Sequence, residues 1–476
     1  MRVNEFFSLL ESYAGSDARI SDDQRSVTYQ DLLHAVEQLA QTFHADGIKR
    51  LGLLVDNSVD WLIIDLAALR AGITIVPLPL FFSPTQRDNA IADAELDALA
   101  YSPSQIQRLP RIPLAHEAAK ITYTSGSTGT PKGVCLAAEH LLSTVAAIRE
   151  ALPANASTCH LALLPLAVLL ENIAGCWLAL SYGADVHLPS MKTLGYTSSH
   201  QIQQEVFFHQ LRTLAPQSLI LTPALAELIV TGVENGQLDP RPFRFLAVGG
   251  AAVPTSLLTR AKRAQIPLYQ GYGLSECGSV VCLNTPRLQR LGSVGKVLNH
   301  QKLKVENGQL YTRGAYMLGY LHGEQQPDRA TWQATGDLGS IDADGYVYVD
   351  GRLSNLLITS FGRNISPEWL ETLAQPYNEW QQFMVLGDGR ERLCALITPS
   401  ANTTAAQIDK ALVHLNQQLP DYARISGWLK TSEPFSTDND LLTHNKRFRR
   451  KAILKTYDQA IQQFYGEKHD LFSDVM

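Results

Sequence analysis

The stretch ITYTSGSTGTPKGV, residues 121–134, decides how the rest of this chain is interpreted. An apolar start is followed by a run of Ser, Thr and Gly that ends in Pro131, Lys132 and Gly133. Glycines let a backbone approach an anion and turn its N–H groups toward it, while hydroxyl groups add donors and a lysine adds charge. The stretch therefore predicts a cradle for a polyphosphate. Its candidate contacts are Thr124, Ser125, Gly126, Ser127, Thr128, Gly129 and Lys132.

Other interpretations of this stretch fit less well. The pattern G-x-x-x-x-G-K-[ST] of P-loop kinases and GTPases fails, because Lys132 follows a proline and precedes a glycine. A flexible Ser/Gly linker rarely places Pro-Lys-Gly directly before a new apolar segment. The chain also has no G-x-G-x-x-G stretch, which argues against an NAD enzyme.

The composition indicates a globular protein with several domains. The 476 residues are 45% hydrophobic and 18% charged, which is enough apolar material for two to four domains with cores of their own. The formal net charge of -6 gives no support to a nucleic-acid surface. The six cysteines include no C-x-x-C pair, so we expect reduced thiols in a cytoplasmic protein.

No stretch of the sequence is typical of a signal peptide or a transmembrane segment. Glu5 and Glu11 interrupt the apolar residues at the N-terminus. The most apolar region, 161–184, is broken by Pro165 and Glu171, so we expect a buried core element there.

The patterns of the chain change twice. Up to about residue 290, short apolar runs alternate with helical periodicity, as in the expected helix 58–72 between strands at 51–57 and 73–80, which predicts parallel α/β layers. Two hairpin patterns follow, at 302–314 and 339–352, and then a stretch of α+β character. We expect an α/β fold with a small β-rich subdomain, divided into an N-terminal domain, 1–352, and a small α+β C-terminal domain, 353–476.

The string YTSGSTGTPKG, 123–133, resembles the phosphate loop of the adenylate-forming superfamily. This superfamily includes acyl-CoA synthetases, the adenylation domains of peptide synthetases and firefly luciferase. The other motifs of the superfamily occur in the same order along essentially the whole chain. The resemblance implies the superfamily's fold, in which a small C-terminal domain rotates about a hinge between two half-reactions.

QGYGLSECG, 270–278, resembles the superfamily's adenine and metal segment. The resemblance assigns Tyr272 to stacking on adenine, Glu276 to Mg²⁺, and Ser275 to the neighbourhood of the α-phosphate or the acyl carboxylate. A flat aromatic ring suits a purine, and a carboxylate suits a magnesium ion that bridges phosphates. Backbone that lies against the nucleotide is expected at Gly249, Gly250, Ala251 and Gly273.

Two further segments complete the implied nucleotide site. In TGDLG, 335–339, Asp337 corresponds to the aspartate that binds both ribose hydroxyls, and Arg352 to an arginine that contacts ribose or phosphate. Ser354 falls at the superfamily's hinge, where Asp or Lys is usual. Arg363 is a candidate contact for a phosphate of the nucleotide or of an incoming cofactor.

The string LLTHNKRFRRKAI, 441–453, departs most from the superfamily. There a lysine in the pattern G-K-x-x-R reaches the acyl carboxylate and the α-phosphate. Matching the flanking apolar residues places Arg447 at that lysine, whereas a shift of one residue places Lys446 there. Both remain catalytic candidates, and a solvated basic face is the third interpretation.

LLPLAVLLEN, 163–172, bears on the acid substrate. Val168 stands where many fatty acyl-CoA synthetases have a histidine, and the nearest histidine is His160. An apolar wall suits a hydrophobic acyl chain, although plain core packing fits equally well. The segment has no aspartate to hold an amino group, and FGRNISPEWLE, 361–371, resembles fatty acyl-CoA synthetases.

The resemblance therefore implies an acid–thiol ligase. ATP, with Mg²⁺, activates a fatty or other hydrophobic carboxylic acid as an acyl-adenylate, and the acyl group then passes to the thiol of CoA or to the phosphopantetheine of an acyl carrier protein. Two alternatives stay open: a stand-alone amino-acid or aryl-acid adenylation enzyme that loads a carrier protein, and a degenerate member that only binds nucleotide. Whether the chain is a monomer or a homodimer also stays open.

Overall fold

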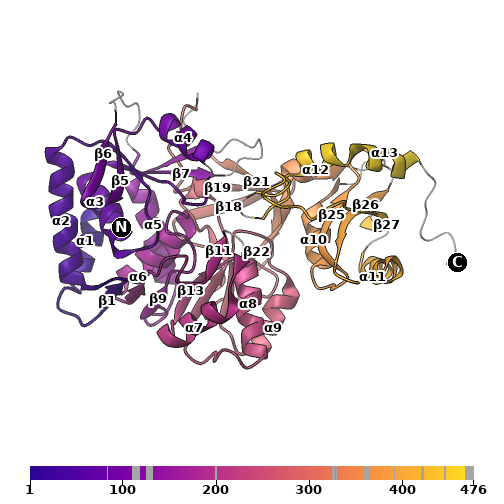
Figure 1. Ribbon diagram of the computed structural model, residues 1–476, viewed down its shortest axis with the longest axis horizontal. Coiled ribbons are helices and arrows are strands. Elements are labelled where there is room, and N and C mark those ends of the chain that lie inside the picture. The colour runs from indigo at the N-terminus through magenta and orange to yellow at the C-terminus, as the bar shows by residue number, and fades with distance from the viewer. Residues whose placement is uncertain are drawn as a thin grey trace.

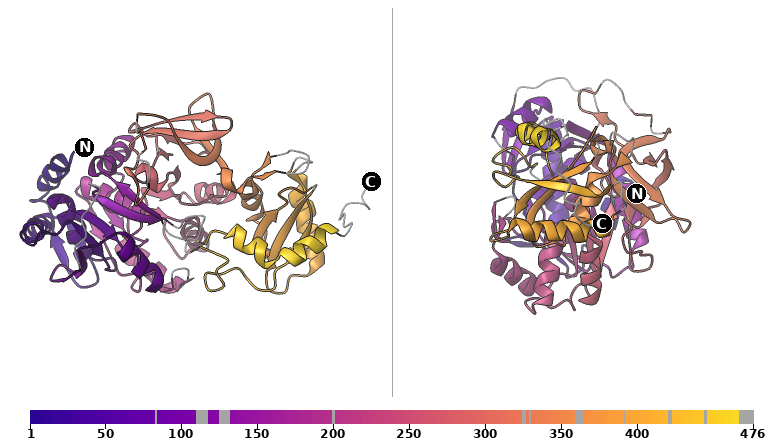
Figure 2. Two further views of the ribbon diagram at one scale, coloured as in Figure 1. Left: turned by 90° about the horizontal axis from the view of Figure 1, so that it is seen from above. Right: turned by 90° about the vertical axis from the view of Figure 1, so that its right-hand side faces the viewer.

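The structure is a computed structural model with two lobes (Figure 1). It describes residues 1–82, 84–109, 118–124, 132–198, 201–323, 327–328, 330–358, 364–390, 392–419, 423–443 and 446–466. The large lobe holds the elements up to β22, and the small lobe holds those that follow. Seen from above, the small lobe meets the large one along one side only (Figure 2).

Two α/β sheets form the body of the large lobe. The first has the strand order β17-β16-β15-β14-β13-β9-β10-β1-β2, that is Lys296–Val297, Cys282–Leu283, Leu268–Tyr272, Phe245–Val248, Ser218–Leu221, Cys159–Leu161, Asp185–His187, Arg19–Ser21 and Ser26–Thr28. The second has the order β20-β8-β7-β4-β3-β5-β6, that is Gly319–Tyr320, Lys132–Leu136, Lys120–Thr124, Thr74–Pro77, Arg50–Leu53, Ala98–Ser102 and Gln105–Arg108. Most neighbouring strands in their centres run parallel, as the alternating pattern predicted.

Helices connect and cover these strands. They are α1 Val3–Glu11, α2 Tyr29–Ala45, α3 Val59–Ala71, α4 Pro84–Asp93, α5 Ala138–Ala151, α6 Leu178–Ser181, α7 Gln204–Leu214, α8 Pro223–Glu234 and α9 Thr255–Arg263, with short helical turns η1 Glu171–Trp177 and η2 Ser275–Cys277. Helix α3 shows why they form. The Ser58 hydroxyl accepts a hydrogen bond from the Trp61 N–H at 3.1 Å, and Gly72 ends the helix at φ +65°. Apolar residues of α3 are buried on all sides, because the helix lies within the core.

A smaller antiparallel sheet completes the large lobe. Its order is β18-β19-β21-β22, that is Gln301–Glu306, Gln309–Gly314, Gln333–Ile341 and Val347–Arg352. The first hairpin turns at Asn307 and Gly308, whose φ values of +51° and +77° are those of a tight primed turn. The expected hairpins are therefore present, and β11 Tyr196–Ser198 with β12 Gln201–Ile202 adds a short ribbon elsewhere in the lobe.

The small lobe has a core of its own. Strands β25 Trp380–Leu386, β26 Leu393–Pro399 and β27 Ile425–Lys430 form its sheet, and β23 Leu357–Ile358 pairs with β24 Asn364–Ile365. Its helical elements are η3 Leu353–Asn355, α10 Pro367–Ala374, α11 Ala405–Gln417, α12 Arg450–Thr456 and α13 Asp458–Gly466. Buried clusters of the small lobe contain residues 357–464 and are separate from the large lobe's core.

The buried core element expected at 161–184 contains a wide π turn, η1. A Cβ at Gly175 would lie 2.1 Å from a Glu171 carboxylate oxygen and 2.8 Å from His160 Nε2. The glycine therefore lets a buried ion-pairing network lie against the helix, which periodicity alone does not predict. In the described part of the chain, no helix combines the length and apolar character needed to cross a bilayer. The six cysteines, all described, have free thiols.

Candidate active site

Tyr272 and Asp337 meet where two sheets adjoin. Tyr272 ends β15, and Asp337 lies in the middle of β21. The Tyr272 hydroxyl donates a hydrogen bond to Asp337 Oδ2 at 2.5 Å. Asp337 pairs with Arg352 across the β21–β22 ladder, and Arg352 Nε lies 2.7 Å from Asp337 Oδ1. Three residues singled out from separate motifs are thus in direct contact.

The Asp337 carboxylate is buried, with 4% of the residue exposed. Burial raises the pKa of this carboxyl, while the charge of Arg352 and the Tyr272 hydroxyl oppose that rise. A carboxylate has about four lone-pair sites, so two protein contacts leave capacity for two ribose hydroxyls. The arrangement suits a hydrogen-bond acceptor for a diol beside an aromatic ring.

Glu276 lies one turn beyond Tyr272, in η2. Its Oε1 accepts a hydrogen bond from the Tyr320 hydroxyl at 2.8 Å, and its carbonyl accepts one from the Met317 N–H at 2.6 Å. Strand β20 pairs with β8, which begins at Lys132, and Lys132 Nζ lies 5.5 Å from the centre of the Tyr320 ring. Tyr320 therefore connects the carboxylate expected to bind metal with the lysine of the phosphate loop.

Tyr320 is not among the site residues predicted from the sequence motifs. The only sequence signal was its place in the GAYMLGY segment, 314–320, which follows the hairpin. Its contact with Glu276 depends on the pairing of Tyr320 with Val134, a register between segments far apart in the chain. Burial and the neighbouring Glu276 raise the pKa of the Tyr320 hydroxyl, which therefore keeps its proton and acts as a donor.

Glycines let backbone segments approach one another around Tyr272. A Cβ at Gly273 would lie 1.7 Å from the carbonyl oxygen of Ser279, so no other residue fits there without a shift of the backbone. Gly249 and Gly250 follow β14, and a Cβ at Gly249 would lie 3.2 Å from the Gly271 carbonyl oxygen. The glycine segments that are expected to contact the nucleotide therefore lie close to neighbouring backbone around Tyr272. Ala251 directly follows Gly250 in the same loop.

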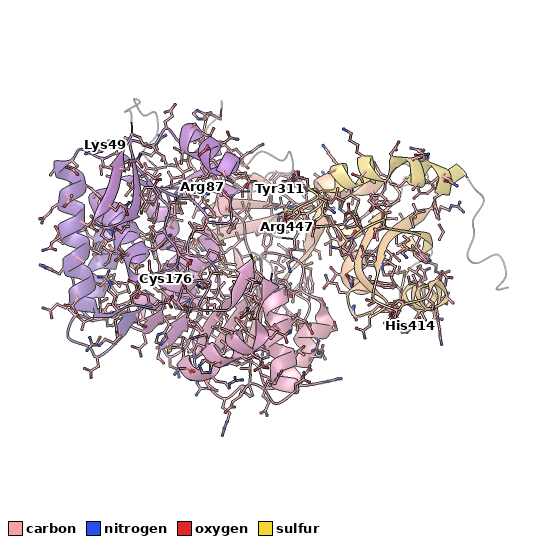
Figure 3. The ribbon with its side chains drawn as sticks, in the orientation of Figure 1. Lys49, Arg87, Cys176, Tyr311, His414 and Arg447 are labelled. Atoms are coloured by element: carbon pink, nitrogen blue, oxygen red, sulfur yellow. The ribbon has the colours of Figure 1, made fainter. Side chains whose placement is uncertain are left out.

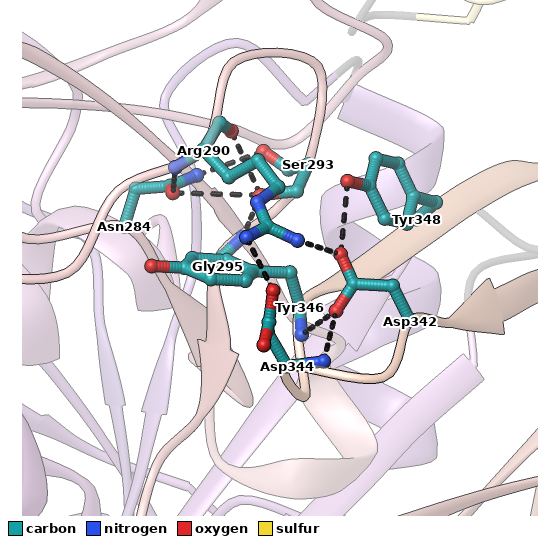
Figure 4. Close-up of polar contacts among 8 residues, drawn as sticks. All are labelled: Asn284, Arg290, Ser293, Gly295, Asp342, Asp344, Tyr346 and Tyr348. Carbon is teal, nitrogen blue, oxygen red and sulfur yellow. Dashed lines mark hydrogen bonds and ion pairs between the residues drawn. The ribbon is translucent and has the colours of Figure 1, made fainter.

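A polar cluster fixes the β21–β22 hairpin to the loop after β16 (Figure 4). Arg290 forms ion pairs with Asp342 and with Asp344, the latter at 2.7 Å, and its guanidinium lies 4.3 Å from the centre of the Tyr346 ring. The Arg290 N–H also donates to the side chain of Asn284 at 2.9 Å. These contacts hold the hairpin that carries Asp337 in place beside the sheet that carries Tyr272.

Arg447 reaches from the small lobe into the large one (Figure 3). One of its guanidinium nitrogens donates to the carbonyl of Gly250, the residue beside the end of β14. The Arg447 N–H donates to the Thr443 hydroxyl at 3.1 Å, which closes a turn in which Lys446 adopts φ +57°. Lys446 and Arg447 are both exposed. Arg447 has the described contact with Gly250, where the nucleotide is expected.

Some expected residues fall outside the described ones. These are Ser125, Gly126, Ser127, Thr128 and Gly129 of the phosphate loop, and Arg363. Thr124 is described as the last residue of β7, and Ser275 as the first of η2, beside Glu276.

Polar residues near the expected acyl wall are engaged with one another. His160 Nε2 lies 2.9 Å from Glu171 Oε1, and the second Glu171 oxygen accepts from the Leu164 N–H at 3.0 Å. Asn172 donates to Asp65 at 3.0 Å, and Lys120 lies 2.6 Å from the same aspartate. The acidic and amide side chains in 167–172 therefore serve the core.

Family models match most of the chain. The model described as AMP-binding enzyme matches residues 10–113 and 99–321, and the model described as AMP-binding enzyme C-terminal domain matches residues 354–469. The chain belongs to the AMP-binding enzyme family. This confirms the resemblance, the α/β fold with a smaller C-terminal domain, and the expected class of acid–thiol ligase that forms adenylates.

Individual relatives agree with this assignment. The chain is 27% identical over 457 residues to the 2-succinylbenzoate–CoA ligase of Geobacillus kaustophilus (strain HTA426), covering 86% of this chain and 87% of that protein. It is 25% identical over 430 residues to the long-chain-fatty-acid–CoA ligase FadD15 of Mycobacterium bovis, covering 74% and 70%. The crystal structure of the anthranilate CoA ligase AuaEII, with anthranoyl-AMP, superposes with a TM-score of 0.81 at 18% identity over 97% of this chain and 100% of that one. This last likeness concerns the fold.

Proposed function

We propose that this AMP-binding enzyme activates an aromatic carboxylic acid with ATP and transfers the acyl group to the thiol of CoA. The observation that carries the proposal is the convergence of Tyr272, Asp337 and Arg352 with the pair Glu276–Tyr320 at the end of β15 and the middle of β21. An aromatic ring, a diol acceptor and a cation-binding carboxylate are the parts that an adenosine polyphosphate needs.

The chemistry follows from the weakness of a carboxylate as an electrophile. Attack of a carboxylate oxygen on the α-phosphorus of ATP expels pyrophosphate and leaves a mixed anhydride. A thiol then attacks the carbonyl carbon, and AMP leaves. The protein needs no covalent nucleophile for either step. Its task is to position the reactants and to stabilise negative charge that develops on the phosphates.

Glu276 fits a magnesium ion. Tyr320 occupies one of about four lone-pair sites of the carboxylate, and Mg²⁺ is usually held by one or two carboxylates together with substrate phosphates and water. When bound, the ion would offset charge on the phosphates. Lys132, beside Tyr320, would add a second positive charge at the same place.

Arg447 takes the part of the superfamily's C-terminal lysine in this proposal. Its guanidinium already contacts the carbonyl of Gly250, and a guanidinium has five N–H donors, so others remain for an α-phosphate oxygen. The segment 353–476 would then rotate as a unit after adenylation and remove Arg447 from the site, with Arg352 to Asn355 as the hinge.

An aromatic acid is proposed within the fatty or other hydrophobic acids that we expected from the sequence. The relative from Geobacillus is named for an aryl acid and has the higher identity and coverage, although the one from Mycobacterium is named for long-chain fatty acids. Glu171 and Asn172 are engaged in the core, which disfavours an amino acid. CoA is favoured as acceptor by the same names, and an acyl carrier protein in the cytoplasm is the alternative acceptor.

The test is acid-dependent exchange of labelled pyrophosphate into ATP by the full chain. Benzoate derivatives, octanoate, palmitate and the common amino acids are compared, and each active acid is then incubated with CoA. The proposal predicts exchange with at least one benzoate derivative and formation of its CoA thioester. Exchange with fatty acids alone would replace the acid, and no exchange with any acid would reject the proposed activity.

A further inference from the structure

Two positively charged residues face each other across the first hairpin of the small antiparallel sheet. Lys302 of β18 and Arg313 of β19 are directly paired in the register of the ladder. Directly paired residues lie on the same face of a sheet with their Cβ atoms about 4.5–5.5 Å apart, and like charges in that position are destabilising. The fold alone therefore gives no reason for this pair.

The charges of the two side chains are not offset by a carboxylate. Within the described part of the chain, neither Lys302 nor Arg313 forms an ion pair, and the Arg313 guanidinium lies 4.9 Å from the centre of the Trp332 ring. Lys304, two residues along the same strand, is different, because its Nζ lies 2.6 Å from Glu306 Oε2. The hairpin thus pairs one of its lysines and leaves Lys302 beside a second cation.

An open cavity of about 370 Å³ is lined by both members of this pair. His300 and Gly314 also contribute to it, and none of the described residues that line it is Asp or Glu. Burial lowers the pKa of His300 to about 4, so this imidazole is neutral near pH 7. The charge of the lining therefore comes from Lys302 and Arg313. The volume is at the lower end of the range for small-molecule sites.

The charged pair lies on the outer face of the hairpin. Gln301 and Thr312 directly precede Lys302 and Arg313 on their strands, are buried, and share a hydrogen bond of 3.0 Å. Successive side chains of a strand point to opposite faces of the sheet, so Lys302 and Arg313 face away from that buried contact. None of the residues assigned to the nucleotide site lines the cavity. It is therefore a separate candidate site.

We propose that this cavity binds a small phosphate-bearing anion between Lys302 and Arg313. A phosphate group carries a charge of about −1.5 to −2 near pH 7, so it matches two cations better than a single carboxylate does. The guanidinium can donate two parallel hydrogen bonds to phosphate oxygens, and the ammonium adds charge and further donors. The bound anion would also offset the repulsion between the two side chains. Free phosphate, pyrophosphate and a compact phosphate monoester share this chemistry.

The test is titration of the full chain with inorganic phosphate, pyrophosphate, glycerol 3-phosphate and acetate at constant ionic strength. Binding is followed by tryptophan fluorescence, and the signal of the matching Trp332→Phe protein is subtracted, because the Trp332 ring contacts Arg313. The difference reports the cavity and excludes binding of the same anions at the phosphate loop.

Lys302→Ala and Arg313→Ala each remove one charge from the cavity. Lys304→Ala is the matched control, because it removes an equal charge from the same strand. Lys304 does not line the cavity and is paired with Glu306. Lys302→Glu places an opposite charge beside Arg313 and so replaces the repulsion with an attraction.

The wild type should bind phosphate or pyrophosphate more tightly than acetate. Lys302→Ala and Arg313→Ala should each raise the Kd by about tenfold or more, as expected for loss of one charged hydrogen-bonding partner. Lys304→Ala should change the Kd by less than about threefold. Lys302→Glu should abolish binding and raise the melting temperature measured without any anion.

Three results would overturn the inference: no signal that depends on Trp332, a Kd unchanged in both Lys302→Ala and Arg313→Ala, or acetate bound as tightly as phosphate. A melting temperature of Lys302→Glu at or below that of the wild type would contradict the repulsion from which the site is inferred. Tighter binding of glycerol 3-phosphate than of the free anions would support the site and identify an organic phosphate as its ligand, and the reverse order would identify a free anion. None of these outcomes depends on activation of an acid, so they are distinct from the test of the proposed function.

Discussion

Arg447→Ala should abolish most adenylate formation, whereas Lys446→Ala should leave it almost unchanged. Arg447 is the basic residue of the C-terminal turn whose guanidinium contacts the carbonyl of Gly250. The charged side chains of Arg352 and Asp337 interact electrostatically with this guanidinium. Lys446, which is exposed like Arg447, occupies the positive-φ position of the turn. The two side chains are adjacent in sequence but are presented differently by the same turn.

The magnitude follows from what the guanidinium does in the transition state. Loss of one well-placed donor to a developing oxyanion costs about 2.7–4 kcal/mol, or about 10²–10³ in kcat. Arg447→Ala should therefore lower kcat for pyrophosphate exchange by about that factor. Lys446→Ala should lower it by less than about threefold, because the contact with Gly250 belongs to Arg447. Arg447→Lys should recover part of the loss, since it restores the charge without the planar set of donors.

The assay separates the two half-reactions. Pyrophosphate exchange reports adenylation, and transfer from a supplied acyl-adenylate to CoA reports the second step. Arg447→Ala should impair the first and spare the second, because the proposed rotation of the small lobe would have moved Arg447 away from Gly250 by then. The reasoning is refuted if Lys446→Ala shows the large loss and Arg447→Ala does not, or if Arg447→Ala slows both half-reactions equally.

Three further substitutions test the support of the site. Asp337→Asn should raise the KM for ATP by about 10- to 100-fold, because it removes the charged acceptor of the ribose hydroxyls, and a KM for ATP within about twofold of wild type would refute that role. Gly175→Ala should lower the free energy of unfolding by about 3 kcal/mol in chemical denaturation, because its Cβ would lie 2.1 Å from a buried carboxylate oxygen. Gly15→Ala is the control, because no atom lies within 4 Å of its Cβ. The control should change the free energy of unfolding by less than about 0.5 kcal/mol. Arg290→Ala should raise the KM for ATP with little change in kcat, because the partly exposed ion pairs that hold the hairpin are lost. An unchanged KM for ATP would show that the hairpin is held without them.

The sequence predicted the elements whose signals are local. Helix α3 has its cap at Ser58 and its end at Gly72, where periodicity and turn chemistry placed them, because both ends are specified by neighbouring residues. The hairpin at Asn307 and Gly308 is equally local. The π turn η1 is different, since it depends on a buried contact between Glu171 and His160 that the apolar pattern does not contain.

The candidate site likewise contains some residues with a local sequence signal and others whose place depends on long-range pairing. Tyr272 and Asp337 were found from motifs, and the structure shows that they are in contact. Tyr320 was missed, because its place beside Glu276 depends on the pairing of β20 with β8. The sequence also left Lys446 and Arg447 open, since neither the positive φ at Lys446 nor the contact of Arg447 with Gly250 has a sequence signal.

One isotope measurement tests the central claim most directly. The full chain is supplied with ATP, CoA and an accepted aromatic acid whose carboxylate oxygens are both ¹⁸O, and the products are analysed by mass spectrometry. If the carboxylate attacks the α-phosphorus, each AMP released with the acyl-CoA carries one ¹⁸O atom and the pyrophosphate carries none. Label in inorganic phosphate, with ADP as the nucleotide product, or unlabelled AMP beside a formed thioester, would contradict an acyl-adenylate at this site.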